Sequence, residues 1–333
     1  MSETTFSEIG KVEAILRLYE GTGFKPFEPQ SFEAPSKGGY VHESSRCFLE
    51  GIDFDLVYFP LKHLGYKSVM AVTGELYASL AHPRTLSVSL GVSAKLDFKH
   101  IKELWEGIVA AAKEHGYKKI SLDLNPSRNG LSIAVSAVGW EELLTGKRRL
   151  APRSKDLVCI SGNVGAAYMG LQVLERGKAD FARAQEDIEK YKMLVGAYLK
   201  PELSDRLVGA LEEDELYPSK GYFVTRGLAD AVKRLSRDTG LGVKIYADKI
   251  PFEGNTFALG KEMDIDPVSA AMNGGDDYRI LFVVPILELE KFRRDFQTFD
   301  IIGHMAQEDV GAVLVTPEGV ELPMRAQGWN DED

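Results

Sequence analysis

The chain has 333 residues, 44% of them hydrophobic and 27% charged, which is enough for two domains with sizeable cores. Its 40 Lys and Arg against 50 Asp and Glu give a net charge of −10. This charge argues against a nucleic-acid partner, because nucleic-acid-binding proteins usually carry a basic face. We find no apolar stretch near the ~20 residues of a membrane span and no signal peptide, so we expect a cytoplasmic protein without a membrane partner.

The first half alternates helical and strand patterns. Apolar spacing predicts helices over residues 7–19, 64–81 and 99–115. A segment rich in Pro, Gly and Ser, residues 21–40, predicts a loop. Strands are predicted over 54–59, 85–93, 119–124 and 131–139.

The second half has the same mixture. Strands are predicted over 157–161, 242–246, 279–284, 300–302 and 312–315, and helices over 166–175, 183–198, 202–213 and 228–239. The basic stretch 148–155 is the expected domain junction. We therefore predict an α/β (α+β) protein with domains 1–150 and 151–333, in which Cys47 and Cys159 are buried free thiols because both lie in apolar runs.

A glycine-bearing turn, Ser161-Gly162-Asn163-Val164-Gly165, follows one predicted strand and opens a helix. Glycines at this place let backbone N–H groups approach an anion, and the helix N-terminus adds partial positive charge. The turn therefore allows two interpretations, a phosphate site or a tight strand-to-helix turn.

A second turn, residues 273–279 (NGGDDYR), precedes the apolar strand 280–284. Its adjacent acids Asp276 and Asp277 suit a cation or a polar ligand group, or are solvated acids of an ordinary turn. Single acids also lie in apolar surroundings, notably Asp53, Glu75 and Asp123. A lone carboxylate in a strand, such as Asp123, is more often solvated than functional.

Four stretches resemble the thiamine-monophosphate kinases, a family of the aminoimidazole-ribonucleotide-synthetase-like superfamily. They are residues 49–55 (LEGIDFD), 60–67 (PLKHLGYK), 161–171 (SGNVGAAYMGL) and 274–278 (GGDDY). Residues 302–304 (IGH) and 328–329 (GW) fit in the same order. The resemblance implies a homodimer with a β-barrel shared between N-terminal domains, α/β C-terminal domains, and phosphorylation of thiamine monophosphate with ATP and Mg²⁺.

The resemblance also implies roles for individual residues. The expected nucleotide contacts are Arg149, Thr225, Ser161, Gly162 and Gly165. The expected substrate contacts are Asp53, Asp276, Asp277 and Trp329. The remains of a metal site would be Glu75, Asp123, Ser44 and Ser45.

The chain departs from the family in its acidic motifs. The family's S-T-D falls on Ser44-Ser45-Arg46, and its D-x-S-D-G-L falls on residues 223–228 (FVTRGL), so that Phe223, Arg46 and Arg226 replace acids. The family's G-D-D-A-A-V has no match, and residues 36–40 stand in its place. An arginine ~5 Å from Mg²⁺ costs about 6–7 kcal/mol at an effective dielectric constant of ~20.

Two outcomes follow from these replacements. The arginines pair with Glu75 and Asp123, which leaves a non-catalytic protein that binds a phosphorylated ligand or nucleotide. Alternatively, they clamp phosphates directly, and an active kinase survives with a rearranged metal site. A dimeric scaffold without a small ligand is a third hypothesis.

Overall fold

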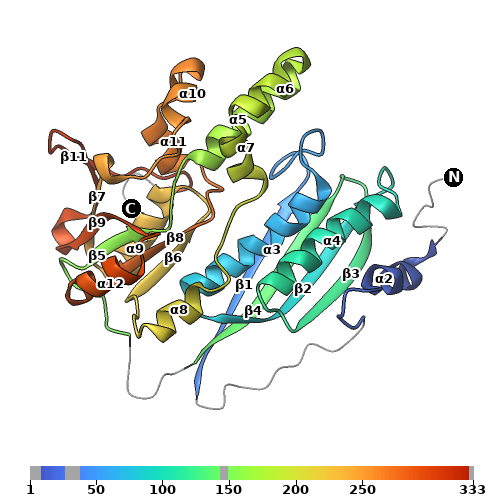
Figure 1. Ribbon diagram of the computed structural model, residues 1–333, viewed down its shortest axis with the longest axis horizontal. Helices are drawn as coiled ribbons and strands as arrows, with labels where there is room; N and C mark the ends of the chain where they lie inside the picture. The colour runs from blue at the N-terminus through green and yellow to red at the C-terminus, as the bar shows by residue number, and fades with distance from the viewer. Residues whose placement is uncertain (1–8, 27–37, 143–148, 330–333) are drawn as a thin grey trace. The chain divides into compact units, whose positions relative to one another are not determined.

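The computed structural model describes residues 9–26, 38–142 and 149–329, and leaves out the side chains of residues 181–183. The chain divides into two compact units, residues 1–146 and 147–333, each built of one sheet with helices (Figure 1). The sequence had suggested a boundary at about residue 150. Among the described residues, no helix has both the length and the apolar content needed to cross a bilayer.

The first unit is a four-stranded sheet in the order β1-β4-β2-β3, in which only β2 and β3 are parallel. Helices α3 and α4 lie on one face of this sheet (Figure 1). Its elements are α2 (Lys11–Tyr19), β1 (Gly39–Leu49), α3 (Leu61–Ala78), β2 (His82–Ser93), α4 (Phe98–Glu114), β3 (Lys119–Ser127) and β4 (Ser132–Glu142).

Side chains of this sheet alternate between two environments, as the pleat requires. Leu86, Val88 and Leu90 of β2 are buried on the helix-covered face. The opposite face, called here the open face, carries small side chains such as Ser45, Ser89 and Ala134, all exposed. Its strand register places Ser45 beside Ser136 and Ser136 beside Ser87.

The second unit is a seven-stranded sheet in the order β11-β10-β7-β9-β5-β8-β6. Its strands are β5 (Leu157–Ile160), β6 (Lys220–Val224), β7 (Gly242–Tyr246), β8 (Arg279–Val284), β9 (Asp300–Ala306), β10 (Ala312–Val315) and β11 (Glu321–Pro323). Its helices are α5 (Ala166–Ala179), α6 (Phe181–Lys190), α7 (Lys192–Leu199), α8 (Leu207–Glu213), α9 (Leu228–Thr239), α10 (Thr256–Met263), α11 (Pro267–Asn273) and α12 (Leu289–Asp295), with 3₁₀ turns η1 (Ala247–Lys249), η2 (Ile286–Glu288) and η3 (Glu308–Val310).

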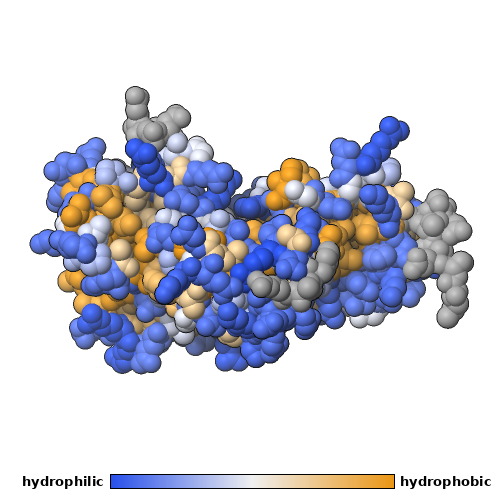
Figure 2. All heavy atoms as spheres, turned by 90° about the horizontal axis from the view of Figure 1, so that it is seen from above, coloured by the Kyte–Doolittle hydropathy of each residue, from blue (hydrophilic) through white to orange (hydrophobic). Residues whose placement is uncertain are grey.

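One apolar cluster joins α9 to the sheet, with Val158, Val224, Leu228, Val232 and Leu281 among its buried members. Large apolar side chains also reach the surface in both units (Figure 2). They include Val12, Ile52 and Val57 in the first unit and Met193, Phe257 and Leu287 in the second.

Several elements differ from the sequence prediction. The strand expected over 54–59 is a series of turns, because Asp55 Oδ1 accepts the Val57 N–H at 2.8 Å and so competes with strand pairing. Strand β1 was not predicted, and its first two residues fall inside the expected loop 21–40. Residues 27–37 of that loop lie outside the described residues. The helix expected over 183–198 is two helices, and Cys47, expected to be buried, is exposed on β1.

Helices α5 and α7 touch closely at Gly170. A Cβ placed there would lie 2.0 Å from the Leu194 carbonyl oxygen, whereas a Cβ at Gly196 of α7 would have no neighbour within 4 Å. Only the first glycine is therefore required by packing.

We expect Gly170→Ala to lower the free energy of unfolding of the second unit by about 1–3 kcal/mol, because the backbones must separate. The matched control, Gly196→Ala, should be neutral or stabilising by about 0.5–1 kcal/mol through helix propensity. Urea unfolding of the three proteins measures both changes, and equal losses in the two variants would contradict the packing assignment.

Candidate functional site

Three turns of the second unit meet at one edge of its sheet. Strands β5 and β6 both run antiparallel to β8, so their carboxyl ends lie beside the start of β8. The turn Ser161–Gly165 follows β5, the turn Thr225–Gly227 follows β6, and the turn Gly274–Tyr278 leads into β8. In open α/β sheets, the carboxyl ends of strands are a common place for ligands.

The Asp277 carboxylate ties two of these turns together. It is 4% exposed and accepts the N–H groups of Gly165 at 2.9 Å and Ala167 at 3.3 Å. Gly165 is the N-cap of α5 and has no capping side chain of its own. Asp277 therefore caps α5 from a distant part of the chain, and its negative charge meets the positive end of the helix.

The third turn joins the same group through the backbone. The Asp276 N–H donates to the Thr225 carbonyl oxygen at 2.9 Å, and the Tyr278 N–H donates to that of Val224 at 3.0 Å. Asp276 and Tyr278 both have positive φ, 58° and 53°, a conformation that costs free energy in residues with a side chain. The Gly274–Tyr278 turn is thus held in a strained shape by both neighbouring turns.

Two glycines allow the turns to approach α11. A Cβ on Gly227 would lie 2.3 Å from the Met272 carbonyl oxygen, and one on Gly165 would lie 2.9 Å from the Ala271 nitrogen. Both glycines also have positive φ, 88° and 78°. Neither position can accept a larger residue without movement of the backbone.

Burial governs the ionisation of the central carboxylate. Loss of hydration raises the pKa of Asp277 to about 7, against the opposing effects of its two N–H bonds and the nearby Arg279. Burial also lowers the pKa of Arg279, whose Nε donates to the Asn163 carbonyl oxygen at 3.1 Å. Arg279 therefore supports the Ser161–Gly165 turn from the side of β8.

The phosphate interpretation of the Ser161–Gly165 turn is not supported by this geometry. The amides of Gly165 and Ala167 already donate to Asp277, and the Val164 N–H donates to the Pro251 carbonyl oxygen at 3.1 Å. The Ser161 hydroxyl accepts the Ile280 N–H at 2.8 Å. The backbone N–H groups of Val164, Gly165 and Ala167 therefore already donate to acceptors within the protein, and Asp277 holds the turn through two of them.

The end of β6 and the turn after it contain Phe223 and Arg226, two of the residues that the family resemblance sets against acids. Phe223 is fully buried and packs edge-to-face on Tyr278, with ring centroids 5.3 Å apart. Arg226 is exposed, and within the described residues its guanidinium has no hydrogen bond or ion pair. One replacement has therefore joined the core, and the other presents a charge to solvent.

In the first unit, the proposed metal residues do not converge. Ser44 and Ser45 are neighbours in β1, so their side chains point to opposite faces of the sheet. Arg46 shares the face of Ser44, next to the buried Phe48, whose ring centroid lies 5.6 Å from the guanidinium carbon. The two serines cannot both be ligands of one ion within this unit.

Asp123 belongs to the open face, away from α3 and Glu75. Its carboxylate pairs with Lys11 of α2 and accepts from Asn125 Nδ2 at 2.6 Å, and these two bonds lower its pKa. Strand β3 lies at the sheet edge opposite β1, so Asp123 does not pair with Arg46 in this unit. Among the described residues, no group of three or more His, Cys, Asp or Glu is arranged to hold a metal ion.

Three further predicted residues belong to none of the three turns of the second unit. Asp53 Oδ2 accepts the Leu49 N–H at 2.8 Å and closes the turn after β1. Arg149 is half-buried at the start of the described part of the second unit. Trp329, expected to face substrate, donates its Nε1–H to Asp230 of α9. Sequence reasoning missed Asp230. Its spacing of four residues from Arg234 predicts an ion pair on a helix, but nothing in the sequence indicates that the carboxylate is buried.

Comparison with known proteins agrees with this architecture. Residues 35–140 match the family described as AIR synthase related protein, N-terminal domain. The thiamine-monophosphate kinase of Pyrococcus horikoshii is 26% identical over 277 residues, which cover 80% of this chain and 78% of that protein.

Two solved structures share the fold. AaThiL complexed with AMPPCP and TMP has a TM-score of 0.71 at 19% identity and covers 97% of each chain. HypE of E. coli, a hydrogenase maturation protein, has a TM-score of 0.71 at 14% identity and covers 96% of this chain and 97% of that one. The matched N-terminal domain and the curated relatives, together with the shared fold, support a place for the chain in the family of AIR-synthase-like proteins that includes the thiamine-monophosphate kinases.

Proposed function

We propose that this protein binds a phosphorylated small ligand or nucleotide on a thiamine-monophosphate kinase-like scaffold, with Mg²⁺-dependent phosphotransfer reduced or lost. The observation that carries the proposal is Arg226, exposed at the edge where three turns meet and uncommitted among the described residues. A guanidinium matches phosphate oxygens in shape and charge, and binds them without a metal.

The relatives suggest the class of ligand. A structure with the same fold is complexed with AMPPCP and TMP, and another, a HypE, is in complex with ATP. We therefore take ATP as the first probe and thiamine monophosphate as the second. Arg149 and Thr225 remain proposed nucleotide contacts, and Asp53 and Asp276 remain proposed substrate contacts.

The residues present do not fit the several Mg²⁺ ions that the family resemblance implies. Glu75 and Asp123 are separated by the sheet of the first unit, and Asp123 is held by Lys11. Mg²⁺ needs several oxygen ligands at short distance in a nearly octahedral arrangement. No catalytic step is therefore assigned to a metal.

The open face supports the proposal of a homodimer. It presents Ser45, Ser87, Ser89 and Ser136 in neighbouring strands, and small side chains allow a second sheet to approach closely. Static light scattering would test this association, since a monomeric mass at micromolar concentration would exclude it. Location in the cytoplasm stays a prediction.

We expect Arg226→Ala to weaken ATP binding about tenfold, the size of one charge-assisted hydrogen bond. Arg206→Ala, which removes an exposed arginine at the N-cap of α8, is the matched control and should bind like the wild type. Calorimetric titration measures both affinities. Equal affinity in all three proteins would remove Arg226 from the site, and absence of ATP binding in the wild type would favour a scaffold without a small ligand.

A second prediction concerns the pH dependence of Asp277. Because burial raises its pKa in the folded protein to about 7, the protonated form is favoured, and the stability it contributes at low pH is lost as pH rises through 7. The free energy of unfolding should therefore fall more steeply from pH 4 to pH 7 in the wild type than in Asp277→Asn.

The control for this comparison is Asp264→Asn, at the exposed C-cap of α10, where φ is 55° and Asn is tolerated. It should keep the wild-type slope. Urea unfolding at several pH values gives the slopes, and parallel curves for the wild type and Asp277→Asn would contradict the assigned ionisation.

A further inference from the structure

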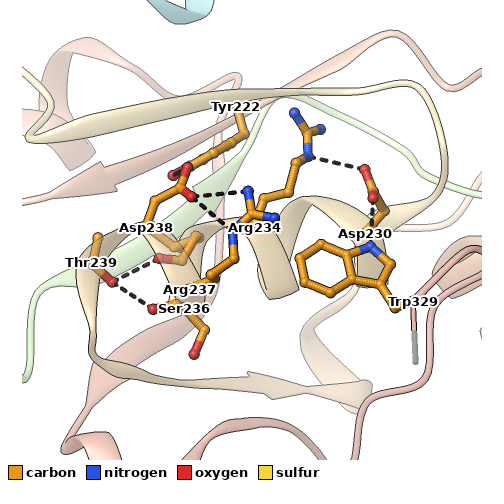
Figure 3. Close-up of polar contacts among 9 residues, drawn as sticks. Tyr222, Asp230, Arg234, Ser236, Arg237, Asp238, Thr239 and Trp329 are labelled. Atoms are coloured by element: carbon orange, nitrogen blue, oxygen red, sulfur yellow. Dashed lines mark hydrogen bonds and ion pairs between the residues drawn. The ribbon is translucent and has the colours of Figure 1, made fainter. Parts of the chain in front are cut away.

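Trp329 makes three contacts with α9, and Figure 3 shows the hydrogen bond among them. Its Nε1 donates to Asp230 Oδ1 at 2.9 Å. Its ring also lies 5.0 Å from the Lys233 ammonium and 5.0 Å from the Arg237 guanidinium. Both cations are placed for a cation–π interaction, which is strongest with tryptophan.

The acceptor of this bond is a buried carboxylate. Asp230 is 3% exposed and lies in the first turn of α9. Its other oxygen accepts from Arg234 Nε at 3.0 Å, and Arg234 Nη2 donates to the Phe223 carbonyl oxygen at 3.2 Å. Asp230 and Arg234 thus link the end of β6 to the start of α9.

This link spans the turn that carries Arg226. Residues 225–227 are the whole connection between β6 and α9, so fixing both ends restricts the turn. Asp230 depends on two donors, and a buried carboxylate that loses one of them bears a desolvation cost. Trp329 supplies one donor from a segment distant in sequence.

Core packing alone does not require the Trp329 contact. The segment that contains it is already anchored by Met324, which is 7% exposed within the apolar cluster of α9 and the sheet. The indole N–H bond is made beyond that anchor, to a polar group of α9. This bond satisfies one oxygen of the buried Asp230 carboxylate and thereby stabilises the first turn of α9.

We infer that Trp329 is a positioning residue: by donating to Asp230 it holds the first turn of α9, and so fixes the Thr225–Gly227 turn that presents Arg226. The effect on ligand binding rests on the proposed function, whereas the effect on the turn does not. Trp329 would then act through the protein and would not contact the ligand.

Trp329→Phe tests this inference, because it keeps an aromatic ring and removes the N–H. We expect hydrogen exchange of the amides of residues 226–231, measured without ligand, to accelerate about tenfold, as for loss of one hydrogen bond to a charged group. Exchange in β5 and β8 should not change. ATP affinity should fall by about threefold or more, with the same stoichiometry.

Val320→Ala, an exposed position between β10 and β11, is the control and should leave both readouts unchanged. Unchanged exchange at 226–231 in Trp329→Phe would overturn the inference, and so would acceleration spread evenly over β5 and β8, which indicates a packing role only. Local acceleration together with absence of ATP binding in the wild type would uphold the positioning of the turn and reject the proposed function.

Discussion

The edge of the second unit where three turns meet depends on the hydrogen bonds accepted by the buried carboxylate of Asp277. It binds the start of α5 to the turn before β8, and that turn is bonded through its backbone to the turn after β6. A buried carboxylate is costly unless its oxygens are satisfied, so the two N–H donors and the neighbouring Arg279 act as one unit with it. The positive φ of Asp276 and Tyr278 persists because this network determines their conformation from both sides.

The same network shows that a resemblance to a kinase motif does not by itself provide a phosphate-binding site. Residues 161–171 resemble a family motif, yet the amides at its turn are used by an internal carboxylate. Since these amides are engaged, a phosphate at this edge would have to be bound by positively charged side chains. Arg226 lies at a position where the family resemblance places an acid. A positive guanidinium repels Mg²⁺ and attracts an anion, so this side chain favours a phosphate over a metal ion.

Much of the architecture could be predicted from the sequence, because long amphipathic helices such as α4 and α9 and apolar strands such as β8 have clear periodicity. Strand β1 was missed because its polar side chains alternate with little apolar content, and 54–59 was wrong because Asp55 forms a local turn. Contacts between distant segments were beyond sequence reasoning. The cap of α5 by Asp277, the pairing of Asp123 with Lys11 and the docking of Trp329 on α9 each join residues that are distant in sequence and show no local pattern.

The central claim is that a phosphorylated ligand is held by arginine side chains without a full set of Mg²⁺ ions. The most direct test is calorimetric titration of ATP in EDTA and again in excess Mg²⁺, followed by measurement of ADP release with thiamine monophosphate. We expect similar affinities in both conditions and little or no ADP release. Binding that occurs only with Mg²⁺, accompanied by ADP release, would contradict the claim and indicate an active kinase with a rearranged metal site.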